Sequence, residues 1–330
     1  MVSVPSGQIP SGQIPSAQIP SAQIPLAQVP SAQVGSAQVP LAQIAGVYHR
    51  RIGDIVVTAL SDGYLDGTVD VLQNIASSQS NRMLEEAFRP GRRTSVNCYL
   101  VQSAGRVALI ETGSGDYLLP TAGKLQANLK AAGVDPSAIE RVILTHMHPD
   151  HSAGLTDPKT GEKFFPNAEL VVHENEPRHW QDDGAMARAS ERAKKLYFAC
   201  AREQMAPYHN VMRTFSGSVE VFPGVTSMPL HGHTPGHSGY MVASGGQSLL
   251  IWGDIVHVPE IQVPRPEVTI EFDTDPHAAA ATRRRVFDMV ATDRQLIAGM
   301  HVHFPGFAHV VKHGDSYAML PEPWDQAFGG

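Results

Sequence analysis

Thr145-His146-Met147-His148-Pro149-Asp150-His151 is the segment that decides the fold, because it places three imidazoles and one carboxylate within six residues. It follows the apolar run Arg141-Val142-Ile143-Leu144. A β-branched and aliphatic run of this kind, closed by a proline, predicts a buried strand that delivers a loop at its carboxyl end. α/β folds keep their chemistry at that end of their strands.

The spacing of these donors favours two metal ions. Side chains two residues apart can converge on one cation, and the next two donors follow too closely to reach the same ion without strain. We therefore assign His146 and His148 to one metal, and Asp150 and His151 to the other. Imidazole and carboxylate donors suit zinc, with manganese, cobalt or iron as substitutes. The alternative is a polar surface loop rich in histidine.

The pattern His-x-His-x-Asp-His after a strand resembles the signature loop of the metallo-β-lactamase superfamily. The three further ligands of that family follow in order: His233 in Gly232-His233-Thr234-Pro235-Gly236-His237, Asp254 in Trp252-Gly253-Asp254, and His301 in Met300-His301-Val302-His303-Phe304-Pro305-Gly306. The resemblance implies that His233 completes the first site and His301 the second, with Asp254 as the bridging carboxylate. It covers the chain from about Tyr48 to the C-terminus.

The resemblance also implies the fold, a four-layer αββα sandwich of the α/β class, whereas periodicity alone predicts only mixed α and β structure. We expect strands at 54–60, 96–101, 106–110, 141–144, 168–173, 219–221, 225–230, 239–243 and 249–252, with 295–300 as the last core strand. We expect helices at 83–88, 118–132, 174–180, 185–205 and 276–291, and a short one from Pro136. Residues 61–67 are predicted as a turn, and Arg283, Arg284 and Arg285 as an exposed face of the last helix.

Residues 1–44 are a separate segment, and we predict a hydrolase domain over residues 45–330. A five-residue unit, Pro-Ser-Ala-Gln-Ile with small variations, repeats from Pro5 to Ile44. Proline at nearly every fifth position excludes a continuous helix and interrupts a central strand. One small aliphatic residue per unit cannot offset the ordering entropy, so we predict an extended or disordered arm. The alternative is an oligomerising or partner-binding repeat.

The composition excludes several classes of protein. The 330 residues are 42% hydrophobic and carry a formal net charge of −7, which offers no basic surface for nucleic acid or acidic lipid. Only Cys98 and Cys200 occur, so a disulfide framework and a thiolate zinc site are excluded. No apolar run reaches the roughly 18 residues of a membrane helix, and no secretory signal is recognised. We expect a soluble protein, with the cytoplasm as the favoured compartment.

The implied chemistry is hydrolysis. Two metals about 3.5–4 Å apart can share a hydroxide, which attacks a carbonyl carbon or a phosphorus. Asp254 and Asp150 are the expected catalytic carboxylates. His257 stands where acyl-homoserine lactonases carry a tyrosine, and is either a pocket acid or a structural residue. This departure favours the methyl parathion hydrolase branch and its esterase and lactonase relatives.

The expected substrate is a small neutral, hydrophobic ester: an organophosphate triester, an aryl ester or a lactone. By the resemblance, four residues line the leaving-group pocket: Leu118, Trp180, Tyr197 and Phe198. The alternative for Tyr197 and Phe198 is ordinary helix packing. Relatives of this type are often dimers, so a homodimer is expected from the resemblance alone.

Other functions and other ligands were weighed. The rival functions are an acyl-homoserine-type lactonase, a β-lactamase-like hydrolase, an iron-dependent sulfur dioxygenase with one metal, and a silent protein organised by the repeat. His303 is the rival of His301 as a ligand. His237 is expected to form hydrogen bonds rather than to coordinate, and His173 and His231 to be structural. Glu111, where the family usually has aspartate, is expected to support the metal loop.

Overall fold

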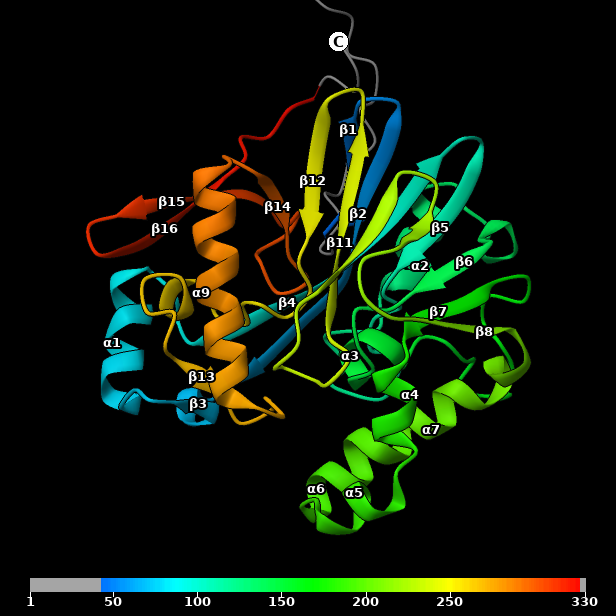
Figure 1. The fold of residues 1–330 in the computed structure, drawn as a ribbon, viewed down its shortest axis with the longest axis horizontal. Coiled ribbons are helices and arrows are strands. Elements are labelled where there is room, and N and C mark those ends of the chain that lie inside the picture. The colour runs from blue at the N-terminus through cyan, green and yellow to red at the C-terminus, as the bar shows by residue number, and fades with distance from the viewer. Residues whose placement is uncertain (1–42, 327–330) are drawn as a thin grey trace, which may run out of the picture. The chain divides into compact units, whose positions relative to one another are not determined.

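Two seven-stranded sheets form the centre of the computed structural model, which describes residues 43–326 (Figure 1). The first sheet is antiparallel at β1-β2-β4-β5 and parallel at β5-β6-β7-β8. In sheet order its strands are β1 (Val47–Ile52), β2 (Ile55–Gly67), β4 (Arg92–Ser103), β5 (Arg106–Ile110), β6 (Arg141–Ile143), β7 (Glu169–His173) and β8 (Met212–Phe215). The predicted arm lies outside the described residues, apart from positions 43 and 44.

The second sheet is antiparallel except where β12 and β14 run parallel. In sheet order its strands are β16 (Ser316–Pro321), β15 (Phe307–His313), β14 (Leu296–Ala298), β12 (Gln247–Ile251), β11 (Ser238–Ser244), β10 (Val225–Pro229) and β9 (Glu220–Phe222). A small ribbon pairs β3 (Leu72–Gln73) with β13 (Thr269–Ile270). The segment predicted at 295–300 is therefore a core strand, but it is not the last one.

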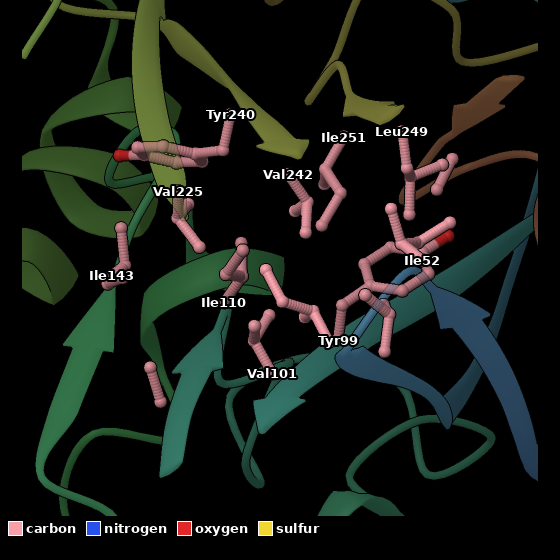
Figure 2. Close-up of a cluster of buried hydrophobic side chains, with 14 of the residues drawn as sticks. Ile52, Tyr99, Val101, Ile110, Ile143, Val225, Tyr240, Val242, Leu249 and Ile251 are labelled. Carbon is pink, nitrogen blue, oxygen red and sulfur yellow. The ribbon is translucent and has the colours of Figure 1, made fainter. Parts of the chain in front are cut away.

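The main core lies between the two sheets. Side chains of the first sheet, among them Tyr99, Val101 and Ile110, point toward Val242 and Ile251 of the second (Figure 2). Successive residues of a strand face opposite sides, so Cys98 and Leu100 on β4 enter a different cluster on the outer face. Because both faces of the central strands are buried, these segments are continuous apolar runs in the sequence.

Helices cover the outer faces of both sheets. α2 (Leu125–Ala131), α4 (Asn175–Trp180) and α7 (Ala199–Met205) pack on the first sheet, and α9 (Pro276–Thr292) packs on the second (Figure 1). The remaining helices are short: η1 (Val69–Val71), α1 (Ser77–Glu86), η2 (Pro136–Ala138), α3 (Pro149–Ser152), α5 (Asp183–Arg188), α6 (Glu191–Ala193), η3 (Lys194–Phe198), η4 (Ala206–Val211) and α8 (Pro259–Gln262). This arrangement confirms the predicted αββα sandwich. Among residues 43–326, no helix is long and apolar enough to cross a membrane.

The predicted turn at 61–67 is wrong, because β2 continues through it to Gly67. These residues pair with β4, and the register shifts between Ser61 and Gly63. The bulge lets a segment rich in glycine and aspartate remain in the ladder. Asp62 is completely buried there, and its carboxylate accepts hydrogen bonds from the backbone N–H groups of Ser114, Gly123 and Leu125.

Two predicted helices are shorter or more broken than expected. Helix α2 begins at Leu125 rather than near 118, because Gly123 has a φ of +75° and its N–H bonds to Asp62. Residues 185–205 form four short helical pieces. Asp182 and Ser190 are the N-caps of two of these, since their side chains accept hydrogen bonds from backbone N–H groups in the first turn.

The predicted exposed arginine face is wrong for Arg283, which is only 1% exposed. Its guanidinium donates hydrogen bonds to the carbonyl oxygens of Ile255, Pro266 and Val268. A buried arginine is tolerated when its donors are satisfied in this way. Arg284 and Arg285 are exposed, as predicted.

Candidate metal centre

Four loops bring the predicted ligands together at one end of the two sheets. The histidine-rich segment leaves β6, and Pro149 begins α3, which turns Asp150 and His151 toward the interior. His233 comes from the loop between β10 and β11, Asp254 follows β12, and His301 follows β14. Parallel strands β12 and β14 end at the same edge, so these last two residues meet there.

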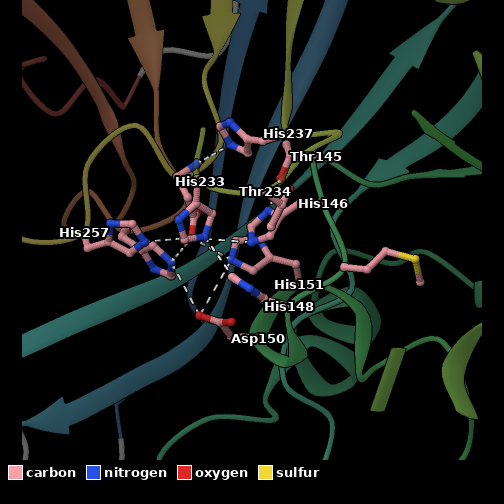
Figure 3. Close-up of polar contacts among 12 residues, drawn as sticks. Thr145, His146, His148, Asp150, His151, His233, Thr234, His237 and His257 are labelled. Carbon is pink, nitrogen blue, oxygen red and sulfur yellow. Dashed lines mark hydrogen bonds and ion pairs between the residues drawn. The ribbon is translucent and has the colours of Figure 1, made fainter. Parts of the chain in front are cut away.

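Figure 3 shows the rings of His146, His148 and His233 converging, and Asp254 lies among the ring nitrogens of this cluster. Its Oδ2 is 3.1 Å from Nε2 of His301, 3.3 Å from Nε2 of both His151 and His233, and 3.7 Å from Nε2 of His146. Two sets of three donors surround it. The histidine half consists of His146, His148 and His233, and the mixed half consists of Asp150, His151 and His301; within each half the donor atoms lie within 4.8 Å of one another.

Hydrogen bonds fix which nitrogen of each ring faces the centre. Nδ1 of His301 donates to the carbonyl oxygen of Ser95 (2.7 Å), and Nδ1 of His233 bonds to the carboxylate of Asp273 (2.8 Å). Nδ1 of His151 bonds to Glu111 (3.1 Å), and Nδ1 of His146 contacts the hydroxyl of Thr145 (2.9 Å). Each contact engages Nδ1 and leaves Nε2 facing the centre, where its lone pair can bind a metal.

The inward-facing atoms fit metal ions. Nε2 of His146 and Nε2 of His151 are buried and have no hydrogen-bond partner among residues 43–326. Nε2 of His233 is 3.0 Å from Nδ1 of His148, so two ring nitrogens face each other across a gap that a shared cation or proton would stabilise. Buried nitrogen and oxygen donors of this kind are the ligand set expected for zinc and similar ions.

Burial favours a metal-ready state of His146 and His148. Burial lowers the pKa values of His146 and His148 well below the ordinary range, so these imidazoles are neutral at pH 7 and offer lone pairs. In the mixed half burial acts in the same direction, but the carboxylate of Asp254 outweighs it and raises the pKa values of His151 and His301. Burial alone would raise the pKa of Asp254, but the surrounding imidazoles, led by His151, hold it well below its usual value. The central carboxylate is therefore ionised.

Two buried glutamates support the two halves. Glu111 accepts a hydrogen bond from the backbone N–H of Thr145 (2.7 Å) and contacts His151 in the mixed half. The longer side chain thus makes the contacts expected of the family's aspartate. Glu176 holds the histidine half, because its two carboxylate oxygens accept four hydrogen bonds. One oxygen accepts from the backbone N–H of Met147 and the indole N–H of Trp180. The other accepts from the hydroxyl of Thr234 and the backbone N–H of Gly236.

Sequence reasoning missed Glu176 and Asp273. Glu176 lies in a predicted helix, where a charged residue is usually solvated, and apart from Trp180 its partners are 29 to 60 residues away. Asp273 is 40 residues from His233. No local pattern marks either residue, so only the tertiary structure identifies them.

The rival histidines occupy the outer positions expected of them. His237 uses both ring nitrogens, since Nδ1 donates to the carbonyl oxygen of Leu230 and Nε2 accepts from the backbone N–H of Asp254. His303 pairs with Glu260 at 2.6 Å, away from the donor cluster. His173 and His231 contact each other, with ring centroids 4.9 Å apart, and neither belongs to the groups of converging donors.

His257 lies beside the cluster. Its Nε2 is 3.1 Å from Oδ2 of Asp254, and its ring stacks on that of His301 with centroids 5.2 Å apart. Burial lowers its pKa to about 4, so the ring is neutral at pH 7. It also lines the cavity above the cluster, which places it within reach of a bound molecule.

A cavity of about 580 Å³ opens directly onto the donors. Most of its wall is apolar or aromatic, with Leu65, Val71, Leu118, Leu119, Leu196, Tyr197 and Phe272 above His148, Asp150, Asp254, His257 and His301. Two of the four expected pocket residues, Leu118 and Tyr197, line this cavity.

Trp180 and Phe198 do not line the cavity, which corrects their expected place. Both are almost fully buried in the core on the outer face of the first sheet, with ring centroids 5.0 Å apart. Trp180 packs behind His148, and its indole N–H bonds to Glu176. Their hydrophobic side chains are more stable in this core than at the cavity wall.

Comparisons with known proteins show the family and the fold. Residues 91–301 match the family model described as "Metallo-beta-lactamase superfamily". The crystal structure of the hydrolase AbOPH, of the beta lactamase superfamily, is similar with a TM-score of 0.81 at 32% identity, covering 86% of this chain and 100% of that chain. AidC, a dizinc quorum-quenching lactonase in complex with its product, has a TM-score of 0.80 at 22% identity, covering 86% and 99%.

Two curated relatives are 22% and 31% identical to this chain over the residues matched. The N-acyl homoserine lactonase of Bacillus thuringiensis is 22% identical over 262 residues, which are 72% of this chain and 91% of that protein. An atrochrysone carboxyl ACP thioesterase of Passalora fulva is 31% identical over 96 residues. That match covers 28% of this chain and spans only 26% of the thioesterase.

Proposed function

Because the chain belongs to the metallo-beta-lactamase superfamily of metal-dependent hydrolases, we propose that it is a dinuclear zinc hydrolase of hydrophobic esters, including lactones, aryl esters and phosphotriesters. One observation carries the proposal: the two donor halves and Asp254 meet at the floor of an open cavity with mostly apolar walls. Concave sites of this kind bind small, largely apolar molecules.

In this proposal the histidine half would hold one ion and the mixed half the other, with the carboxylate of Asp254 available to both. When bound, two such ions supply a water nucleophile with a pKa near 7 and polarise the oxygen of the electrophile. Oδ1 of Asp254 is buried and without a hydrogen-bond partner in the described part of the chain, so it is placed to accept a hydrogen bond from the attacking water.

His257 and the cavity wall orient the substrate. Nε2 of His257 faces Oδ2 of Asp254 at 3.1 Å, whereas Nδ1 has no hydrogen-bond partner among the described residues, so the neutral ring can offer Nδ1 to a bound substrate. Leu118, Tyr197 and Phe272 offer apolar surface to the body of the ester. A lactone fits this arrangement as well as an open-chain ester does, which agrees with the lactonases among the similar proteins.

Metal content and hydrolysis, measured on the same purified full-length protein, test the proposal. We expect about two zinc ions per chain, together with turnover of at least one of methyl parathion, an aryl acetate, dihydrocoumarin and a homoserine lactone. Turnover of a β-lactam alone would contradict the proposed substrates. One iron per chain without hydrolysis would contradict the hydrolase itself and favour an oxidoreductase such as a sulfur dioxygenase.

A further inference from the structure

We propose that the cavity contains a carboxylate subsite formed by Arg92, so that the preferred substrate is an ester or lactone with an apolar body and an acid group at its far end. This inference rests on the proposed function and narrows it, because it gives the substrate a charge that apolar walls alone would not predict. It depends on the placement of one guanidinium group and on the charges around it.

Arg92 begins β4 and lines the same cavity as the metal-site donors. Its Nε donates to the carbonyl oxygen of Thr68 (2.8 Å), and its Nη1 to the hydroxyl of Thr94 (3.1 Å). Both acceptors are neutral, so they hold the guanidinium in place without cancelling its charge. A guanidinium that is fixed before binding loses little entropy when it recognises an anion.

Gly67 makes room for this group. A Cβ atom at position 67 would lie 1.9 Å from Nη2 of Arg92, far inside van der Waals contact. Gly67 also lines the cavity. The backbone therefore passes close beneath the guanidinium, and any larger residue at this position would have to push it away.

The positive charge of Arg92 has no ion-pair partner in the part of the chain that the structure describes. The neighbouring carboxylate of Asp66 is already engaged by Arg93, through two hydrogen bonds of 2.8 Å. The other carboxylates on the cavity wall, Asp150 and Asp254, belong to the donor cluster. Arg92 thus presents a cation that has no direct ion pair among residues 43–326 to whatever enters the cavity.

A second arginine adds to the positive potential. Arg192 lines the same cavity, and its Nη1 is 3.1 Å from Glu271, so this pair is close to neutral. Burial lowers the pKa of Arg92, and the positive charge of Arg192 lowers it further. The negative charges of Glu271 and Asp150 raise it in part. A bound carboxylate would offset both the burial and the repulsion between the guanidinium groups, and the planar fork of arginine matches its two oxygens.

The position of Arg92 sets the length of the substrate. Ser95, three residues further along β4, holds His301 through its carbonyl oxygen. At about 3.3 Å per residue the Cα atoms of Arg92 and Ser95 are about 10 Å apart. The acid group of the substrate should therefore lie several bonds from the scissile carbonyl, with apolar atoms between them against Val71 and Phe272.

A matched pair of esters tests the subsite in the zinc-loaded, full-length protein. The mono-4-nitrophenyl ester of hexanedioic acid carries a terminal carboxylate, and 4-nitrophenyl hexanoate has the same length without it. We expect the wild-type enzyme to have the higher kcat/KM for the acid ester. In Arg92→Gln the ratio of the two kcat/KM values should fall about 10- to 100-fold, because a charge-assisted hydrogen-bonded pair is lost.

Two further variants control this measurement. Gly67→Ala should lower the ratio as well, because it displaces the guanidinium without removing its charge. Arg106→Gln should leave the ratio unchanged, because Arg106 pairs with Glu140 and neither residue lines the cavity. A wild-type preference for the neutral ester, or a ratio that is the same in Arg92→Gln, would overturn the proposed subsite.

Equilibrium binding separates failure of the subsite from failure of the hydrolase function. Calorimetry on the zinc-loaded protein compares hexanedioate with hexanoate, in wild type and in Arg92→Gln. If no ester is hydrolysed, the hydrolase proposal fails. Tighter binding of hexanedioate that disappears in Arg92→Gln would still support the subsite, whereas equal binding of the two acids would overturn it.

Discussion

The two halves of the candidate metal centre are built to the same plan but differ in their exposure. Each takes two donors from the segment after β6 and one from a loop of the second sheet. The histidine half is enclosed, with side chains at most a few per cent exposed. In the mixed half, the side chain of Asp150 is 18% exposed. Residues of both halves line the cavity, and the difference in exposure comes from Asp150.

The difference extends to the residues behind the donors. Glu176 ties the histidine half together by four hydrogen bonds that join the loop at Met147 to the loop at Gly236. The mixed half relies on Glu111 for His151 and on a backbone carbonyl for His301. Because each half has its own buried carboxylate, the two metal sites should be separable by mutation.

Asp254→Ala should have the largest effect, since it removes the group shared by both halves. Oδ2 of Asp254 is within about 3.3 Å of donor atoms in each. We expect loss of both metals and a fall in kcat/KM of at least about 1000-fold, which corresponds to about 4 kcal/mol. Elemental analysis and ester hydrolysis measure these quantities; two retained metals with wild-type turnover would refute the bridging role.

His233→Ala and His301→Ala should each remove about one metal per chain, from the histidine half and the mixed half respectively. Truncating a donor leaves two protein ligands in that half and the other half intact. His303→Ala is the matched control, because its ring pairs with Glu260 outside the cluster. Metal analysis distinguishes the three variants, and loss of metal from His303→Ala would contradict the ligand assignment.

Glu176→Gln and Glu111→Gln should weaken metal binding about 10- to 100-fold, each in its own half. In Glu176→Gln an NH₂ group would replace an oxygen that accepts two hydrogen bonds. In Glu111→Gln the amide oxygen can still accept a hydrogen bond from the backbone N–H of Thr145. The NH₂ group then donates to Nδ1 of His151, so the ring proton moves to Nε2, the nitrogen that would bind the metal. Competition with a chelator measures the affinities.

The pattern of loss decides whether the halves are independent. If both variants weaken the same metal, or both metals equally, the centre is one cooperative unit rather than two separately supported halves. Unfolding measured on the metal-free variants is the control, because a general loss of stability would lower the unfolding midpoint without metal as well.

Trp180→Phe should have the smallest effect. It keeps an aromatic ring in the core but removes the N–H that bonds to Glu176, so we expect a loss of about 1–3 kcal/mol in the free energy of unfolding. Metal binding in the histidine half should weaken slightly. KM for aryl esters should stay the same, because Trp180 is outside the cavity wall; a raised KM with unchanged stability would return it to the pocket.

Sequence reasoning anticipated the strands better than the helices near the site. The central strands are buried on both faces, so their apolar runs are visible in the sequence. The helix predicted at 118–132 and the turn predicted at 61–67 were wrong for one shared reason. Asp62 binds the N–H groups of residues 114, 123 and 125, a set of contacts across more than 50 residues that no local pattern reveals.

The sequence by itself determined the family and, through the resemblance, the layered fold. It also predicted a donor set, because metal chemistry restricts ligands to a few residue types whose spacing is visible along the chain. The tertiary structure decided which residues hold those donors, that Trp180 and Phe198 belong to the core, and that Arg92 faces the cavity. These are contacts between segments far apart in the chain. They depend on how the two sheets pack and where the loops meet, which local residue patterns do not encode.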